Sequence, residues 1–145
     1  MVSKKRFYGI LAVCALAGLV IGFTYMELRQ ENGVDIAYDV VSTQGAAENL
    51  TGMESVNVYG MVWNIGDKEA KNVTVTVIFT DTAHDRVVRK TVVDGVDLPP
   101  KGAVSVEFNA EYLRELTIPK TSVDEIIQVN WIEDGQLKTL TSRGM

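Results

Sequence analysis

The chain has 145 residues, 46% of them apolar, and a formal net charge of −5, which suits about one globular domain. Beyond position 6 it holds 11 basic residues and all 19 acidic ones, so that part carries 11 − 19 = −8. This acidity argues against nucleic acid as a partner, because nucleic acid requires clustered lysine and arginine. A single cysteine, Cys14, excludes a disulfide framework and favours a prokaryotic exported protein.

Residues 7–26 read FYGILAVCALAGLVIGFTYM and contain no charged residue. About 20 apolar residues span the hydrocarbon core of a bilayer as a helix. Three basic residues, Lys4, Lys5 and Arg6, directly precede this segment. By the positive-inside rule, residues 1–6 are cytoplasmic and the rest of the chain is extracytoplasmic. The sequence therefore predicts a single-pass protein of the cell membrane whose partner is the lipid bilayer.

Two other interpretations of this segment stay open. Ala15-Leu16-Ala17 has the A-x-A form of a signal-peptidase site, so the segment could be a cleaved signal peptide. Cys14 could instead end a lipoprotein signal, although Val13 stands where such signals prefer a small residue. Protein mass and protease accessibility separate the three interpretations.

Residues 27–33 (ELRQENG) form a short polar linker, and residues 34–145 are expected to be the extracytoplasmic domain. There, apolar and polar residues alternate with a period of two, as a sheet with one solvated face requires. Ala70–Thr80 is the clearest case. Seven strands are expected: Val34–Ser42, Ser55–Ile65, Ala70–Thr80, Arg86–Val93, Ala103–Asn109, Ile126–Glu133 and Gln136–Thr141.

Turn residues separate these strands. Asn64–Asp67 and Asp134-Gly135 are typical of turns, and the prolines in Leu98–Gly102 interrupt strand pairing. Glu111–Leu116 is expected to form a short helical turn. Short strands at intervals of about 8–12 residues predict an all-β fold, an immunoglobulin-like antiparallel β-sandwich of about seven strands.

One stretch resembles a known family. Val62–Gly66 has the pattern V-x-N-x-G, Ala70–Val77 reads A-x-N-V-T-V-T-V, and Phe79–Asp81 reads F-T-D. Together with the later PPKG and VSVEF, these residues resemble the FxLYD and CARDB-type domains, with Asp81 identical to the final residue of the FxLYD pattern. The resemblance covers roughly residues 55–109. It implies an immunoglobulin-like sandwich of archaeal or bacterial surface proteins that serves as a spacer, adhesion module or assembly part.

The expected function is therefore binding or scaffolding in a prokaryotic, specifically archaeal, cell envelope, with an envelope protein or S-layer component as the partner. An N-terminal membrane helix joined to a β-sandwich is also similar in architecture to archaellum stator components. This similarity gives an alternative, a subunit of a surface machine such as an archaellum stator or a secretion apparatus.

No catalytic residues, cofactor or metal are expected. The only histidine, His84, lies near Asp81 and Asp85, and one histidine with loop aspartates is a poor zinc site. We expect an exposed β-turn there. Asp94 and Asp97, together with Asp81, offer oxygen ligands for calcium, which leaves a calcium- or metal-binding module as a further alternative.

Two kinds of surface site are predicted. Asn49-Leu50-Thr51 and Asn72-Val73-Thr74 are sequons, which makes Asn49 and Asn72 candidate glycosylation sites. Tyr59, Met61 and Trp63 alternate with inward-facing valines, so an exposed position would make them an interface. Trp131 alternates with Ile127 and Val129 and is expected in the core.

Overall fold

The computed structural model describes residues 33–143. The predicted cytoplasmic residues 1–6, the predicted membrane helix 7–26 and linker residues 27–32 lie outside the described residues. Among residues 33–143, no helix is long and apolar enough to cross a membrane. The strands are β1 (Ile36–Ala46), β2 (Met53–Asn64), β3 (Ala70–Asp81), β4 (Arg86–Leu98), β5 (Ser105–Glu115), β6 (Asp124–Glu133) and β7 (Gln136–Arg143).

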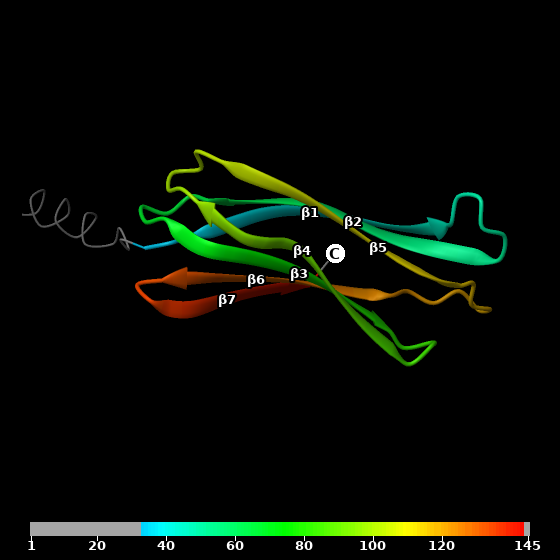
Figure 1. The fold of residues 1–145 in the computed structure, drawn as a ribbon. Helices are drawn as coiled ribbons and strands as arrows, with labels where there is room; N and C mark the ends of the chain where they lie inside the picture. The colour runs from blue at the N-terminus through cyan, green and yellow to red at the C-terminus, as the bar shows by residue number, and fades with distance from the viewer. Residues whose placement is uncertain (1–32, 144–145) are drawn as a thin grey trace, which may run out of the picture. The chain divides into compact units, whose positions relative to one another are not determined.

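These strands form two antiparallel sheets that lie face to face (Figure 1). One sheet has the order β1-β2-β5 and the other has the order β4-β3-β6-β7. The predicted all-β class, the seven strands and their positions along the chain are confirmed. Each strand formed where the sequence alternates, because side chains on successive strand residues point to opposite faces of a sheet.

Three segments differ from the prediction, and the first of them is β1, which ends at Ala46 instead of Ser42. The short helical turn expected at Glu111–Leu116 is wrong, because β5 continues to Glu115 and pairs with the first half of β2. Strand β4 also runs beyond its predicted end to Leu98. It passes Asp94–Asp97 through register shifts against β3, with Asn72 (φ +52°) and Gly95 (φ +71°) in left-handed conformations. A β-bulge of this kind lets a strand continue where strict alternation fails.

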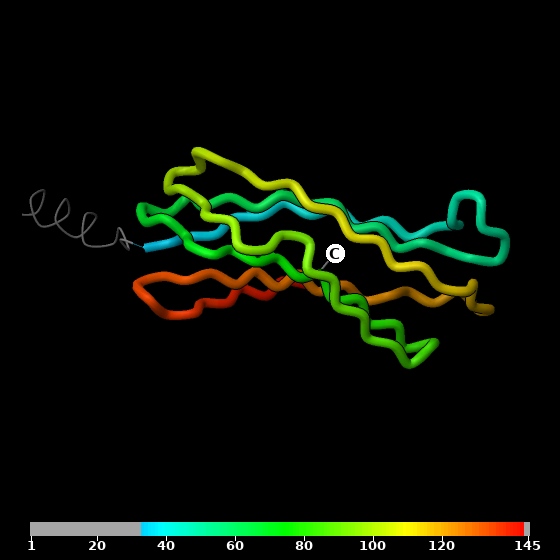
Figure 2. The backbone as a smooth tube through the Cα atoms, viewed as in Figure 1, coloured from blue at the N-terminus to red at the C-terminus, as the bar shows by residue number. Residues whose placement is uncertain are grey.

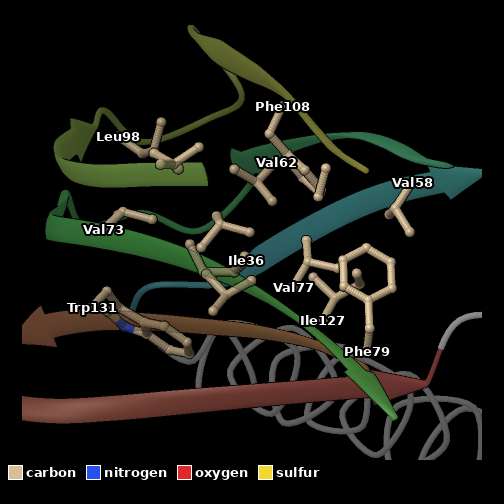
Figure 3. Packing of buried hydrophobic residues seen from close by; sticks show 14 of the residues in the cluster. Ile36, Val58, Val62, Val73, Val77, Phe79, Leu98, Phe108, Ile127 and Trp131 are labelled. Carbon is tan, nitrogen blue, oxygen red and sulfur yellow. The ribbon is translucent and has the colours of Figure 1, made fainter. Parts of the chain in front are cut away.

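The hydrophobic core lies between the two sheets (Figure 3). Its fully buried valines come mainly from β2 and β3, and full burial of such a side chain stabilises the fold by about 1.5–3 kcal/mol. Trp131 of β6 is 9% exposed, which confirms its predicted place in the core. Core residues with at most 2% exposure include Val56, Val58, Val62, Val73, Val75, Val77, Phe79, Leu98, Ile127 and Val129.

The loops gather at two ends of the sandwich (Figure 2). We call the end where the described chain begins at Gly33 the near end; it holds the loops at 65–69, 99–104 and 134–135. The far end holds the loops at 47–52, 82–85 and 116–123. The first strand therefore leads from the near end towards the far end.

A fully buried amide, Asn64, organises the near end. Its Oδ1 accepts hydrogen bonds from the backbone N–H of Asp35 (3.2 Å) and of Gly66 (3.0 Å). Its Nδ2 donates to the carbonyls of Lys68 (2.6 Å) and Leu98 (3.2 Å). These four bonds occupy both polar atoms of the side chain. Asn64 thus fastens the start of β1, the β2–β3 loop and the end of β4 to one point.

Glycine is required at position 66, two residues later, because the neighbouring backbone leaves no room for a side chain. A Cβ there would lie 2.2 Å from the carbonyl oxygen of Gly33 and 2.5 Å from the backbone nitrogen of Asp35. The backbone N–H groups of Asp67 and Lys68 donate to that same carbonyl of Gly33. The V-x-N-x-G pattern is therefore explained by the attachment of the incoming chain to the β2–β3 loop.

We expect Asn64→Ala to lower the free energy of unfolding by about 2–4 kcal/mol, because it leaves several buried backbone groups without a partner. Urea denaturation followed by circular dichroism measures the change. Asn109→Ala is the matched control, because Asn109 is exposed on β5 and its loss should change stability by no more than about 0.5 kcal/mol. Equal effects of the two substitutions would contradict this role of Asn64.

Candidate functional site

A buried ionic cluster lies at the far end of the sandwich, and Arg114 is its centre. Its Nε lies 2.5 Å from Oε1 of Glu54, and its Nη1 lies 2.8 Å from Oδ1 of Asp81. Its Nη2 donates to the carbonyl of Thr121. The side chains of all three charged residues are at most 1% exposed. Because Arg114 and Glu54 belong to one sheet and Asp81 to the other, the guanidinium joins the sheets.

Asp81 has two further partners. The hydroxyl of Tyr112 donates to Oδ2 of Asp81 over 2.9 Å, and Nδ1 of His84 lies 2.8 Å from the same oxygen. The backbone N–H of His84 donates to Oδ1. The expected turn is confirmed at residues 82–85, where three of the four residues are exposed and the side chain of His84 is 30% exposed, but Asp81, which precedes the turn, is buried and only 1% exposed. Alternation along β3 points Asp81 inward, on the same face as Phe79.

Gln44 of β1 extends the cluster to the loop at 116–123. Its Nε2 donates to Oε2 of Glu54 (3.2 Å) and to the carbonyl of Thr121 (2.9 Å). Its Oε1 accepts from the backbone N–H of Val123 (3.2 Å). The cluster thus joins four strands, β1, β2, β3 and β5, and the loop at 116–123 through polar groups that satisfy one another.

The cluster shifts the protonation equilibria of its members. Burial raises the pKa of the Glu54 carboxyl, but hydrogen bonds from Gln44 and Arg114 outweigh burial and hold this pKa below its usual value. For Asp81, burial acts in the same upward direction, and bonds from Tyr112, His84 and Arg114 bring the net pKa below its usual value. Burial and the neighbouring Asp81 raise the pKa of the Tyr112 hydroxyl.

The aspartates considered for calcium binding do not lie together. Asp81 pairs in register with Arg86, whereas Val93, next to Asp94, pairs with Val75. Six residues of strand put Asp94 about 20 Å from Asp81, so the proposed calcium ligands are separated. Within residues 33–143, no group of three or more His, Cys, Asp and Glu side chains could hold a metal ion.

The outer surface of the β1-β2-β5 sheet, which we call the outer face, carries the predicted interface residues. Val58 and Val62 are fully buried, whereas Tyr59 is 53% exposed, and Met61 and Trp63 are partly exposed. The stripe therefore points away from the core, as alternation requires. Val41 of β1, which pairs with Tyr59, adds a further apolar side chain that is 59% exposed.

Two hollows meet on the outer face at Tyr59. The first, of about 260 Å³, has Val41, Tyr59, Gly60 and Met61 among its lining residues, with Asp39 and Glu107 also lining it. The second, of about 690 Å³, extends from Tyr59 to the loop at 47–50 at the far end. Together they form what we call the outer groove.

Both sequons lie on the surface. Asn49 is exposed in the far-end loop and has a left-handed backbone (φ +61°). Asn72 is exposed at the bulge of β3, where its backbone N–H donates to Oδ1 of Asp97 over 2.8 Å. Glycosylation of either residue remains a prediction.

Sequence reasoning missed the ionic cluster. Glu54 and Arg114 are charged residues at inward positions, and charge ordinarily marks a surface position. The signal was present in β5, where Phe108, Ala110, Tyr112 and Arg114 follow one another at a spacing of two. Continuing the alternation through the arginine would have extended the strand and placed Arg114 inside.

Comparison with known proteins gives a likeness of fold. No family model matches the chain, and no curated protein matches it. A solved structure of a Bordetella pertussis protein given the name ApaA is similar, with a TM-score of 0.55 and 16% identity over 74% of this chain and 88% of that chain. A target of the Northeast Structural Genomics Consortium has 16% identity over 74% of this chain and 84% of that chain, with a TM-score of 0.48. The first likeness supports the β-sandwich architecture alone.

We expect the free energy of unfolding to fall as the pH drops below about 4.3, the usual pKa of an unfolded glutamic acid. The lowered folded-state pKa values of Glu54 and Asp81 stabilise the fold above the unfolded-state pKa values. This stabilisation is lost as the pH falls through the folded-state values. Urea denaturation at a series of pH values measures the loss.

Glu54→Gln removes one of the two titrating groups, so the variant should be less stable at neutral pH and lose less stability in acid. Glu111→Gln is the control, because Glu111 is exposed on β5. A Glu54→Gln variant with the same acid dependence as the unchanged protein would contradict this account.

Proposed function

We propose that the chain is a membrane-anchored, extracytoplasmic immunoglobulin-like domain with a binding or scaffolding role in the cell envelope. The observation that carries this proposal is the outer face, where the residues Val41 and Tyr59 are more than half exposed beside two hollows. Exposed apolar surface that is continuous and bordered by polar residues marks interaction sites. An envelope protein or S-layer component is the proposed partner.

The immunoglobulin-like assignment is supported by two packed antiparallel sheets of three and four strands. It departs from the constant-type arrangement at one strand. In constant-type immunoglobulin domains the fourth strand is part of the same sheet as the first, second and fifth strands. Here β4 pairs with β3 in the other sheet. The outer face is consequently bounded by β1 and β5 alone, which keeps it narrow and leaves both edges free of a fourth strand.

The anchor is supported by the uncharged residues 7–26 and the three basic residues before them. Seven linker residues separate this segment from the sandwich, which the chain joins at the near end through the Gly33 carbonyl. The outer groove extends to the loop at 47–50 at the far end, the end of the sandwich opposite Gly33 (Figure 1), and in this proposal a partner within the envelope binds it there.

We expect the full-length protein to remain in the membrane fraction after a carbonate wash, and its measured mass to include residues 1–26. Protease added to intact cells should digest the domain after residue 33. A soluble protein whose mass begins after Ala17 would replace the anchor with a cleaved signal peptide. A mass increase from a lipid with Cys14 as the first residue would replace it with a lipoprotein.

We expect a photoreactive amino acid in place of Tyr59 to form a light-dependent adduct with an envelope protein in intact cells. The matched control carries the same amino acid in place of Thr141, which is exposed on β7 in the opposite sheet. Mass spectrometry identifies the adduct. Components of a motility or secretion apparatus would favour the surface-machine alternative, and no adduct at Tyr59 above the level at Thr141 would contradict the proposed binding role.

A further inference from the structure

The charged residues that line the outer groove are all acidic. Neither of its two hollows is lined by a lysine, arginine or histidine, whereas four carboxylates line them. The outer surface of the opposite sheet differs, because Arg89 and Arg143 share it in one row with Ile78 and Ile126. The acids of the outer groove are Asp39, Glu48, Glu107 and Glu111.

The strand register arranges part of this pattern in rows across the sheet. Asp39, Met61 and Glu107 pair across β1, β2 and β5, so one row has a carboxylate on each side of an apolar residue. The next outward row is Val41, Tyr59 and Asn109, which has no charge. The third is Thr43, Asn57 and Glu111. Along the groove the rows therefore read acidic, apolar, acidic.

Neighbouring outward rows are two residues apart along each strand, which is about 7 Å. An extended segment has the same repeat on one of its own faces. The complement of the three rows is therefore a segment with a basic residue, an apolar residue and a basic residue at positions i, i+2 and i+4. The aliphatic stem of an arginine would cover Tyr59 and Met61 while its guanidinium pairs with a carboxylate.

The carboxylates that flank Met61 are available for such a pairing. Among residues 33–143, neither Asp39 nor Glu107 takes part in an ion pair, and both are exposed. Their Cα atoms lie about 10 Å apart, two strand spacings. A cation above Met61 would relieve the repulsion between these two carboxylates.

We propose that the outer groove binds an extended segment of a partner protein in which two basic residues flank an apolar residue at alternate positions. This inference rests on the proposed function and names the chemistry of its partner. A second copy of the chain is a poorer occupant, because the chain after position 6 carries 11 − 19 = −8 and two such domains repel each other. An anionic lipid surface is repelled for the same reason.

The test uses the peptide Arg-Ser-Leu-Ser-Arg and a matched peptide with citrulline, which has the same shape without the charge, in place of both arginines. Full-length protein labelled at the methionine methyl groups is purified in non-ionic detergent, and the Met61 signal is assigned by Met61→Leu. The Met61 signal should shift saturably with the arginine peptide. The citrulline peptide should bind at least tenfold more weakly, and added salt should weaken the binding of the arginine peptide.

The double variant Glu107→Gln with Glu111→Gln should bind the arginine peptide at least tenfold more weakly. The control, Asp94→Asn with Asp124→Asn, removes the same charge from exposed positions of the opposite sheet and should leave binding unchanged. No Met61 shift at peptide concentrations up to about 10 mM, or equal binding of both peptides, would overturn the inference. A Met61 shift that follows protein concentration without peptide would identify a second copy as the occupant and also overturn it.

The two proposals can fail separately. A photochemical adduct at Tyr59, together with a Met61 signal that does not shift with the arginine peptide, would support the binding role. The same pair of results would reject the basic segment as the partner. Absence of both the adduct and the shift would reject both proposals.

Discussion

Among residues 33–143, Arg114 is the one cation among the buried charges, and its guanidinium makes the burial of Glu54 and Asp81 between the two sheets tolerable. A carboxylate loses several kilocalories per mole of hydration on entering the interior, and without such a partner nothing would offset this loss. Because the two acids come from different sheets, their common cation fixes how the sheets meet at the far end. The loop that precedes β6 is held by the same group, through the carbonyl of Thr121.

Two buried polar side chains, one near each end of β2, also help to set the register of this strand. Glu54 and Asn64 stand at its two ends, both fully buried and both hydrogen-bonded to specific partners. A slip of one residue would exchange the faces of a strand, which would bury Tyr59 and expose Val58. The buried valines of β2 already oppose such a slip, and the two polar side chains add hydrogen-bond partners that this register supplies.

The strand positions could be predicted from sequence because each strand has one face against the core. Apolar and polar residues therefore alternate along it. The stripe of Tyr59, Met61 and Trp63 followed from the same rule. The ionic cluster did not, because a buried Arg114 looks like a surface residue until Glu54 and Asp81 are known to lie beside it. The rows of the outer groove could not be predicted either, because Asp39 and Glu107 are distant in sequence and only the pairing of β1, β2 and β5 makes them neighbours.

The attachment at Gly33 has a mechanical consequence. The described chain begins at Gly33 at the near end and leads directly into β1, whose residues Ile36–Ala46 are all paired with β2. A pulling force on residue 33 would therefore act parallel to this strand and perpendicular to its hydrogen bonds. Such a force loads the whole ladder in shear instead of opening it one bond at a time, and the Asn64 amide adds its bond to Asp35 at the point where the load enters. Under such a load the β1–β2 ladder, and the outer face with it, would resist unfolding through all of its hydrogen bonds at once.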